Sequence, residues 1–163
     1  MLRKATLWPY NVGMTAPNFS LADQTGTLRK LTDFAGQWVI LYFYPKDDTP
    51  GCTTEACSFR DEYEFLKSKG LNIIGVSKDS VASHLKFANK YHLNFPLLSD
   101  PGATTIKAYD AWGSKKFMGR TFEGIRRQTF LIDPAGEIVK SYPNVSPKGH
   151  ALQILEDFEQ LQI

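Results

Sequence analysis

Runs of apolar residues along the chain predict the strands. An unbroken apolar run at 38–43 and a mostly apolar run at 71–77 have the pattern of strands that are buried on both faces. Shorter segments separated by turn residues predict a hairpin at 19–22 and 27–31, an extended segment at 95–98, and a second hairpin at 128–133 and 137–142.

Apolar residues at helical spacing predict the helices. One helix is expected from about 53 to 69, with Gly70 just beyond its end, and another at 81–91. Asp100-Pro101 is expected to cap a short helix that runs through Ala108, and Ser146-Pro147 to begin the last helix. The predicted apolar stripes are Val81, Leu85, Ala88 and Tyr91 in the second helix, and Ala151, Ile154, Leu155, Phe158 and Leu161 in the last.

The order of these elements predicts the fold class. Strand, helix, strand and helix, followed by a hairpin and a helix, is an α/β order with a mixed central β-sheet flanked by helices. Thiol enzymes of the thioredoxin type are similar in this order, so we expect a thioredoxin-like fold with an extra N-terminal β-hairpin. We expect residues 1–13 to be an N-terminal extension and residues 14–163 to form a single domain.

Composition excludes several classes of function. The chain has 163 residues, 42% of them hydrophobic and 22% charged, as in an ordinary globular protein. A formal charge of +2 without a dense Lys/Arg run argues against nucleic-acid binding. No segment approaches the ~20 apolar residues of a membrane span, and no secretory signal is recognisable. We therefore expect a cytoplasmic protein without a membrane partner.

The chemistry is expected at the only two cysteines, Cys52 and Cys57. They follow a loop that begins at Pro45, just after the predicted strand 38–43 and at the start of the predicted helix. The positive end of a helix dipole favours a thiolate, so this position suits a reactive thiol. A redox pair is the natural interpretation for closely spaced cysteines in a chain without an export signal.

The spacing of the two cysteines restricts how they can react. On a helix, Cys52 shares a core-facing stripe with Ala56, Phe59, Tyr63 and Leu66. Cys57 is rotated from Cys52 by about 140° and displaced by about 7.5 Å, which puts their Cα atoms about 8.6 Å apart. A disulfide tolerates at most about 7 Å. If both residues are helical, the first turn must unwind before they can bond.

Less specific interpretations remain open for these residues. Cys52 can be a small buried core residue and Cys57 an idle, half-exposed thiol. A structural zinc site is disfavoured, because it needs four ligands and no cysteine or histidine lies near the pair. The histidines are expected on helix surfaces: His84, His92 and, in the first turn of the last helix, His150. A Cys-x-x-Cys oxidoreductase is disfavoured because four residues, not two, separate the cysteines.

The motif Pro45-x-x-x-Thr49-x-x-Cys52 resembles the active-site motif of the peroxiredoxins. The whole segment 43–57 is similar to the PrxQ, or bacterioferritin comigratory protein, subfamily, in which a resolving cysteine often follows five residues after the first. The resemblance covers about residues 14–160, including the segments 16–19, 75–77, 95–100 and 124–133.

The resemblance implies a role for each motif residue. Cys52 would be the peroxidatic residue, whose thiolate attacks a hydroperoxide and becomes a sulfenic acid. Thr49 would hydrogen-bond the peroxide and the thiolate, and Pro45 would shield the sulfenic acid or merely end the strand. Arg127, selected over its neighbour Arg126 by its distance from the following Thr-Phe, would stabilise the thiolate and the leaving oxygen. Without the family, either arginine would be a solvated surface charge.

The remaining expectations also follow from the resemblance. Glu55 would orient that arginine, or would be an exposed acid in the first turn of the helix. Cys57 would resolve the sulfenic acid as an intramolecular disulfide, which thioredoxin or a similar dithiol would reduce. Hydrogen peroxide and organic hydroperoxides would be reduced to water and alcohols without an organic cofactor or metal. We expect a monomer. Two other functions are alternatives to a peroxidase: a general thiol–disulfide oxidoreductase and a non-catalytic redox sensor.

Overall fold

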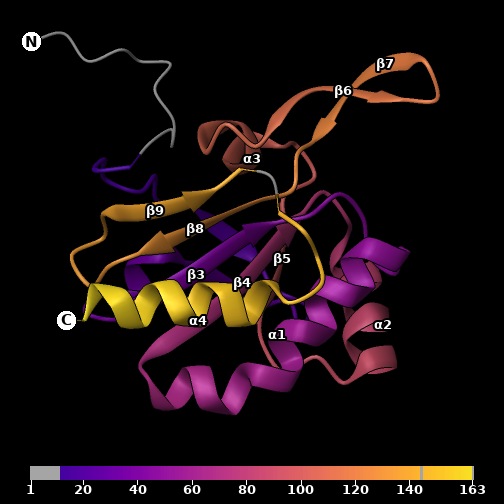
Figure 1. Cartoon of the computed structure of the whole chain (residues 1–163). Helices are drawn as coiled ribbons and strands as arrows, with labels where there is room; N and C mark the ends of the chain where they lie inside the picture. The colour runs from indigo at the N-terminus through magenta and orange to yellow at the C-terminus, as the bar shows by residue number, and fades with distance from the viewer. Residues whose placement is uncertain (1–11, 144, 163) are drawn as a thin grey trace, which may run out of the picture.

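The computed structural model describes residues 12–143 and 145–162 (Figure 1). In chain order the elements are β1 (Ser20–Ala22), β2 (Leu28–Lys30), the 3-10 helix η1 (Leu31–Phe34), β3 (Trp38–Phe43), α1 (Pro50–Ser68), β4 (Leu71–Ser77), α2 (Val81–Tyr91), β5 (Leu97–Ser99), α3 (Thr104–Ala108), β6 (Trp112–Phe117), β7 (Arg120–Ile125), β8 (Gln128–Ile132), β9 (Ile138–Tyr142) and α4 (His150–Leu161).

The main sheet contains seven strands in the order β2-β1-β5-β4-β3-β8-β9. Its centre is parallel, because β4 pairs in parallel with both β3 and β5. The outer pairs β1–β2, β1–β5, β3–β8 and β8–β9 are antiparallel. The predicted mixed α/β sheet flanked by helices is therefore confirmed.

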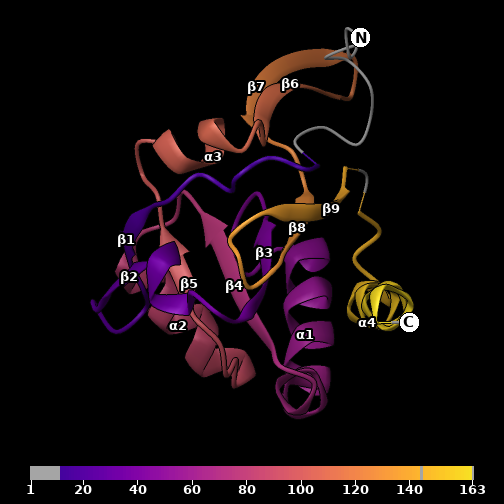
Figure 2. The ribbon, with the colours of Figure 1, turned by 90° about the vertical axis from the view of Figure 1, so that its left-hand side faces the viewer.

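The sheet separates two apolar cores, because successive side chains of a strand point to opposite faces. Ile40 and Tyr42 of β3 pack with α1, α2 and α4, whereas Val39, Leu41 and Phe43 pack with α3 and the N-terminal segments. Figure 2 shows α1 and α4 side by side, away from α3.

Several predicted elements are confirmed at their bounds, among them β3, β4 and α2. The first helix begins earlier than expected, at Pro50, because the extended backbone of Thr49 places a proline at the first helical position. The last helix begins later, at His150, because Gly149 before it has a left-handed backbone (φ 76°). Ser146-Pro147 is thus not the helix start.

The predicted stripe of α2 is confirmed at Ala88, which is buried, and at Tyr91, which packs against the core, but it was wrong at Leu85. The buried residues of this helix are His84, Phe87 and Ala88, while Leu85 is 43% exposed. The helix is therefore turned about its axis relative to the expectation, and His84 points into the protein. In α4 the predicted stripe is buried except for Leu161, which is exposed.

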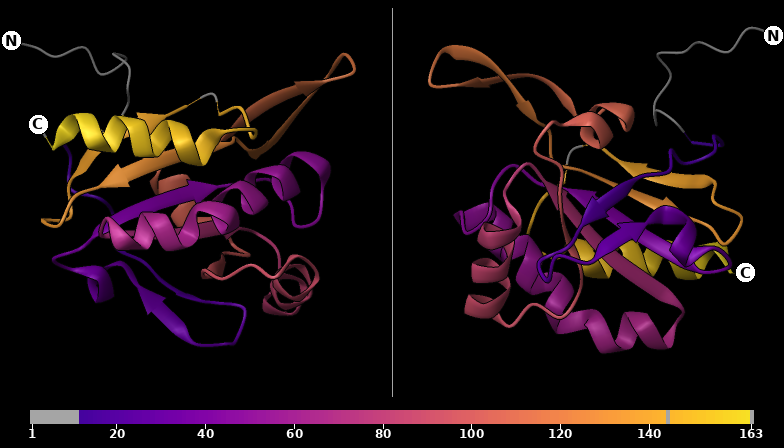
Figure 3. Two further views of the ribbon diagram at one scale, coloured as in Figure 1. Left: turned by 60° about the horizontal axis from the view of Figure 1, so that its bottom comes forward. Right: turned by 180° about the vertical axis from the view of Figure 1, so that it is seen from behind.

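The β-hairpin formed by β6 and β7, which the apolar pattern does not predict, projects from the body of the protein (Figure 3). Its strands β6 and β7 pair only with each other and form a separate two-stranded sheet. Most residues of both strands are at least partly exposed. The base of this hairpin lies next to α3 and leads directly into β8 (Figure 1).

The predicted N-terminal extension lies mostly outside the described residues. The amide of Gly13 donates to the Ile138 carbonyl (2.7 Å), and the Ile138 amide donates to the Met14 carbonyl (2.9 Å). Gly13 and Met14 therefore lie beside the start of β9. The boundary at residues 13 and 14 stays a prediction. Among the helices of the described segments, none is long and apolar enough to cross a bilayer.

Candidate active site

Cys52 lies in the first turn of α1, directly after the loop that follows β3. Pro50 occupies the first turn of the helix, and the Thr53 amide donates to the Thr49 carbonyl at 2.8 Å. Thr49 is the N-cap residue, so the segment 49–52 brings the cysteine to the helix N-terminus. That terminus favours negative charge on the sulfur.

The predicted core stripe of this helix is confirmed. Cys52, Ala56, Phe59 and Leu66 are buried, and Tyr63 packs against the same core. Cys52 is only 1% exposed. Cys57 is half-buried, and both are free thiols within one continuous helix.

Arg127 is the arginine that contacts the sulfur. Its Nη2 lies 3.4 Å from Cys52 Sγ, and its Nη1 donates to Glu55 Oε1 at 2.6 Å. Arg126 turns away and donates from Nη2 to the Asp110 carbonyl at 3.1 Å. Gly51 permits the close approach, because a Cβ atom there would lie 3.1 Å from Arg127 Nη2.

Glu55 is fully buried, so its interpretation as an exposed first-turn acid was wrong. Burial raises the pKa of Glu55 to about 7, although the charge of Arg127 acts to lower it. Burial by itself would lower the pKa of Arg127, but the charges of Cys52 and Glu55 raise it above its ordinary value. Arg127 therefore stays charged between two acidic groups and is held in place by both.

Pro45 and Thr49 lie in the loop between β3 and α1, directly before the helix that carries Cys52. The Thr49 hydroxyl donates to the Lys46 carbonyl at 2.8 Å, which leaves its lone pairs able to accept a hydrogen bond. Pro45 is half-buried and lines a surface hollow together with Arg127. The structure thus places Pro45, Thr49, Cys52 and Arg127 at one edge of the sheet, and Cys57 lies farther along α1.

The expectation of a surface position for His84 was wrong. His84 is fully buried, and its Nδ1 lies 2.7 Å from Asp47 Oδ2 while its Nε2 lies 3.0 Å from the Leu98 carbonyl. Each ring nitrogen thus lies within hydrogen-bonding distance of an oxygen atom. Asp47 also accepts from the Tyr44 hydroxyl (2.6 Å) and from Ser83 Oγ (2.8 Å). These contacts tie the active-site loop to α2.

His150 is also buried, contrary to its predicted surface position. Its Nε2 lies 2.8 Å from Thr129 Oγ1, and its Nδ1 lies 3.1 Å from Gln153 Oε1. Burial lowers the pKa of His150 to about 4, so the ring is neutral at neutral pH. Its ring packs edge-on against Phe59, with the ring centroids 5.7 Å apart, so His150 is part of the packing around α1. His92 is exposed, as expected, at the end of α2.

One group of potential metal ligands exists among the described residues: Asp47, Asp79 and His84, with their ligand atoms within 4.8 Å of one another. Those atoms already bind neighbouring protein groups. Asp79 Oδ2 accepts from the Asp47 amide (2.8 Å) and from Ser77 Oγ (2.7 Å). The three side chains therefore form a hydrogen-bonded support for the loop.

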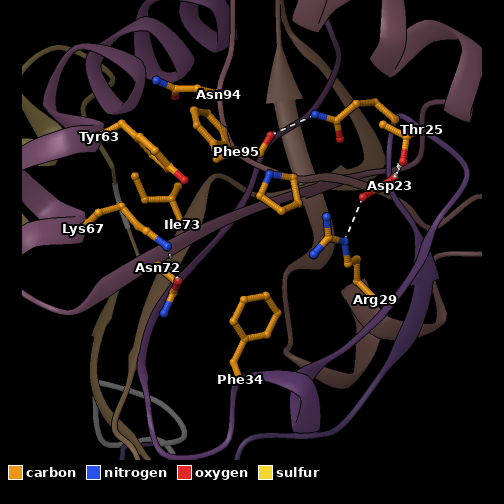
Figure 4. A pocket seen from close by; sticks show the side chains of 12 residues that line it. Asp23, Thr25, Arg29, Phe34, Tyr63, Lys67, Asn72, Ile73, Asn94 and Phe95 are labelled. Carbon is orange, nitrogen blue, oxygen red and sulfur yellow. Dashed lines mark hydrogen bonds and ion pairs between the residues drawn. The ribbon is translucent and has the colours of Figure 1, made fainter.

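A second hollow, of about 280 Å³, lies away from the cysteines (Figure 4). It borders the start of β4 at Asn72 and Ile73, whereas Cys52 follows the opposite end of the parallel strand β3. Its charged groups have partners within the protein: Arg29 Nε forms an ion pair with Asp23 at 2.8 Å, and Lys67 Nζ donates a hydrogen bond to Asn72 Oδ1 at 3.2 Å. We assign no part of the thiol chemistry to it.

Comparisons with known protein families and proteins match most of the chain. The AhpC/TSA family matches residues 12–141. A putative peroxiredoxin bcp of Coxiella burnetii is 46% identical over 144 residues, which cover 88% of this chain and 95% of the relative. Peroxiredoxin Bcp of Bacillus subtilis is 45% identical over 152 residues, which cover 91% of this chain and 97% of the relative.

Solved structures are similar over nearly the whole chain. A Xylella fastidiosa PrxQ variant superposes with a TM-score of 0.89 at 37% identity, over 94% of this chain and 98% of that one. The thioredoxin-like fold is thereby confirmed. Fold and site together define a thiol-dependent peroxidase. The chain belongs to the AhpC/TSA family and is a peroxiredoxin of the Bcp/PrxQ type.

Proposed function

We propose that Cys52 is the nucleophile that reduces the hydroperoxide. The observation that carries this assignment is the 3.4 Å contact between its sulfur and the Arg127 guanidinium at a helix N-terminus. The thiolate attacks the terminal oxygen, an S–O bond forms and the O–O bond breaks. The departing alkoxide or hydroxide takes up a proton, which leaves a sulfenic acid on Cys52 and releases an alcohol or water.

The neighbouring residues align this displacement. Arg127 stabilises negative charge on the sulfur and on the departing oxygen. Glu55 holds the Arg127 guanidinium in the orientation that this requires. The Thr49 hydroxyl, which already donates to Lys46, accepts a hydrogen bond from the peroxide. Pro45 limits access of water to the sulfenic acid.

Cys57 completes the oxidative half of the cycle. Its thiol attacks the sulfenic sulfur, a disulfide forms and water leaves. Because both cysteines lie within α1, the first turns of this helix must unwind before the sulfurs can meet. A dithiol reductant of the thioredoxin type then reduces the disulfide by thiol exchange. The cycle needs no second chain, which supports a monomer, and we place the enzyme in the cytoplasm.

A coupled assay tests this function. With thioredoxin, thioredoxin reductase and NADPH, the protein should consume many equivalents of hydrogen peroxide, and Cys52→Ser should consume none. Cys57→Ser should react once and then stall. Disulfide mapping by mass spectrometry after one equivalent of peroxide should show the Cys52–Cys57 bond. Reduction of insulin without peroxide turnover would support a general oxidoreductase, and a single oxidation without recycling would support a redox sensor.

A further inference from the structure

A hollow of about 450 Å³ lies beside the active site. It is bordered by the site residues Pro45 and Arg127, by Lys115 and Arg126 at the base of the hairpin, and by Pro143 and Val145 of the segment after β9. Three cationic side chains line this hollow and no acidic side chain does, among the residues the structure describes. Its remaining wall is mostly apolar.

Of the three cations that line the hollow, Lys115 is the one that forms no ion pair with a described residue, because Arg126 pairs with Asp110 and Arg127 with Glu55. Lys115 Nζ donates to the Ile125 carbonyl at 2.7 Å, and Lys115 takes part in none of the ion pairs between described residues. Burial lowers the pKa of Lys115 and the positive charge of Arg127 lowers it further, whereas the charge of Cys52 acts in the opposite direction. A partly desolvated ammonium close to another cation is unfavourable by itself, and an anion in the hollow would relieve it.

Arg126 is fixed at the same hollow. Its Nη2 lies 3.1 Å from the Asp110 carbonyl and 3.6 Å from Asp110 Oδ1. The guanidinium packs against Gly113 of β6, where a Cβ atom would come within 2.8 Å of Arg126 Cζ. The hairpin base therefore holds two cations beside the reactive arginine: Lys115, which forms no ion pair with a described residue, and Arg126, which Asp110 orients.

We propose that this hollow is an anion-binding subsite that selects organic hydroperoxides carrying a carboxylate close to the peroxide group. The proposal rests on the proposed function of Cys52. Lys115 binds the carboxylate, with Arg126 beside it, and Pro143 and Val145 contact the short alkyl part. Because Lys115 and Arg127 line one hollow, both ends of the substrate must fit within it, which favours a compact molecule. The carboxylate itself is unchanged in the reaction.

The test compares two tertiary hydroperoxides of the same skeleton, γ-hydroperoxy-isocaproate and its methyl ester. The measured quantity is the ratio of kcat/KM for the acid to that for the ester, in which any effect on the thiolate itself cancels. We expect the protein to favour the acid by about tenfold, as expected for a charge-assisted hydrogen bond. Lys115→Met should bring the ratio close to one, and added salt should lower it in the unaltered protein.

Lys116→Met is the matched control. Lys116 is the next residue of β6, is exposed and points to the opposite face of the strand. Its replacement removes the same charge from the same strand, so it should leave the ratio unchanged. Lys115→Gln, which keeps a donor near the Ile125 carbonyl, should behave like Lys115→Met if the charge matters.

Binding can also be measured without turnover. Isocaproate, which has no peroxide group, should slow the alkylation of Cys52 by iodoacetamide in the unaltered protein but not in Lys115→Met. An acid-to-ester ratio near one in the unaltered protein, or an equal loss for both compounds in Lys115→Met, would overturn the proposal. Failure to reduce any hydroperoxide, hydrogen peroxide included, would instead refute the proposed function, whereas protection by isocaproate would still report the subsite.

Discussion

At the scale of single residues, the Arg127 side chain joins the two acidic groups of the site. One of its terminal nitrogens lies against Cys52 Sγ and the other against Glu55 Oε1. A lysine has the same charge but cannot make both contacts from one rigid group. The geometry of the guanidinium, as well as its charge, is therefore part of the site.

Arg127→Lys should lower the rate constant for the reaction of Cys52 with hydrogen peroxide by roughly a hundredfold, because an oriented donor to the developing charge is lost. Stopped-flow tryptophan fluorescence or competition with a peroxide dye would measure it. Arg120→Lys, on the exposed strand β7, is the control and should react normally. A rate within threefold of the unaltered protein would show that charge alone suffices.

The buried carboxyl of Glu55 should make stability depend on pH. Its pKa is raised by burial from an ordinary 4.5 to about 7, so the folded state holds the proton more tightly than the unfolded state. The stabilisation is therefore complete below the ordinary value and is lost as pH rises through about 7. The unfolding free energy of the unaltered protein, minus that of Glu55→Gln, should fall over this range by at most about 3 kcal/mol.

Urea denaturation at several pH values would measure this difference. The subtraction removes the contribution of other titrating groups, since both proteins contain them. A difference that rises with pH between about 4.5 and 7 would show that the ion pair with Arg127 outweighs burial.

The buried pair of Asp47 and His84 should position the loop that carries Pro45 and Thr49. His84→Asn retains a donor near the former Nδ1 and should preserve much of the contact with Asp47. His84→Gln places its donor near the former Nε2, toward the Leu98 carbonyl, and should lose that contact. The rate with peroxide, divided by the rate of alkylation with iodoacetamide, should fall by about tenfold in His84→Gln and much less in His84→Asn.

Alkylation of Cys52, followed by mass spectrometry so that Cys57 is not counted, needs a thiolate that the reagent can reach but not the aligned loop, so this ratio separates positioning from general loss of structure. Equal ratios in the two variants, after each is shown to fold by circular dichroism, would mean that the contact with Asp47 does not position the loop.

At the scale of elements, α1 must adopt two states if its two cysteines are to bond. In the reduced protein it is continuous over Pro50–Ser68. One equivalent of hydrogen peroxide should remove amide protection from residues 50–58, measured by hydrogen exchange with mass spectrometry, while α4 keeps its protection. Cys57→Ser should keep α1 protected after the same treatment. Continued protection in the disulfide form would contradict the unwinding step.

The sequence predicts those elements that have a strong pattern of their own. β3 and β4 are buried on both faces and appear as apolar runs, and α2 is bounded by a serine cap. The hairpin β6–β7 has no buried face along most of its length, so no periodic pattern marks it. Its contribution to the site, through Lys115, was missed for the same reason.

Whether a polar residue is buried depends on the segments that pack against its helix or strand. The sequence of that helix or strand alone does not show which segments these are. The apolar residues of α2 suggested a face through Leu85, but Asp47 on the distant loop provides a partner that brings His84 inward. Glu55 is likewise buried because Arg127, distant in sequence, reaches it. The motif residues Pro45, Thr49 and Cys52 are local and could be found by spacing; the surroundings that orient them are tertiary.

At the scale of the whole molecule, the sheet topology explains why Arg127 meets Cys52. β8 runs antiparallel to β3, and Phe43 at the end of β3 pairs with Gln128 at the start of β8. The loop after β3 and the residue before β8 therefore emerge at the same edge of the sheet. The hairpin leads into β8 at this edge, so one strand pair brings together the thiol, its arginine and the cationic hollow.

The same packing implies that the reduced protein is more stable than its disulfide form. Unwinding the start of α1 would expose Cys52 and Glu55 and leave the partly buried Arg127 without its ion-pair partner, at a cost of about 3–5 kcal/mol. A disulfide that closes so short a loop returns only about 2 kcal/mol. We therefore expect the oxidised protein to melt roughly 5 °C below the reduced protein in differential scanning calorimetry. Cys57→Ala, heated with and without reductant but without peroxide, should show no such difference. An oxidised protein that melts at or above the temperature of the reduced one would mean that the disulfide forms without loss of the packing around α1.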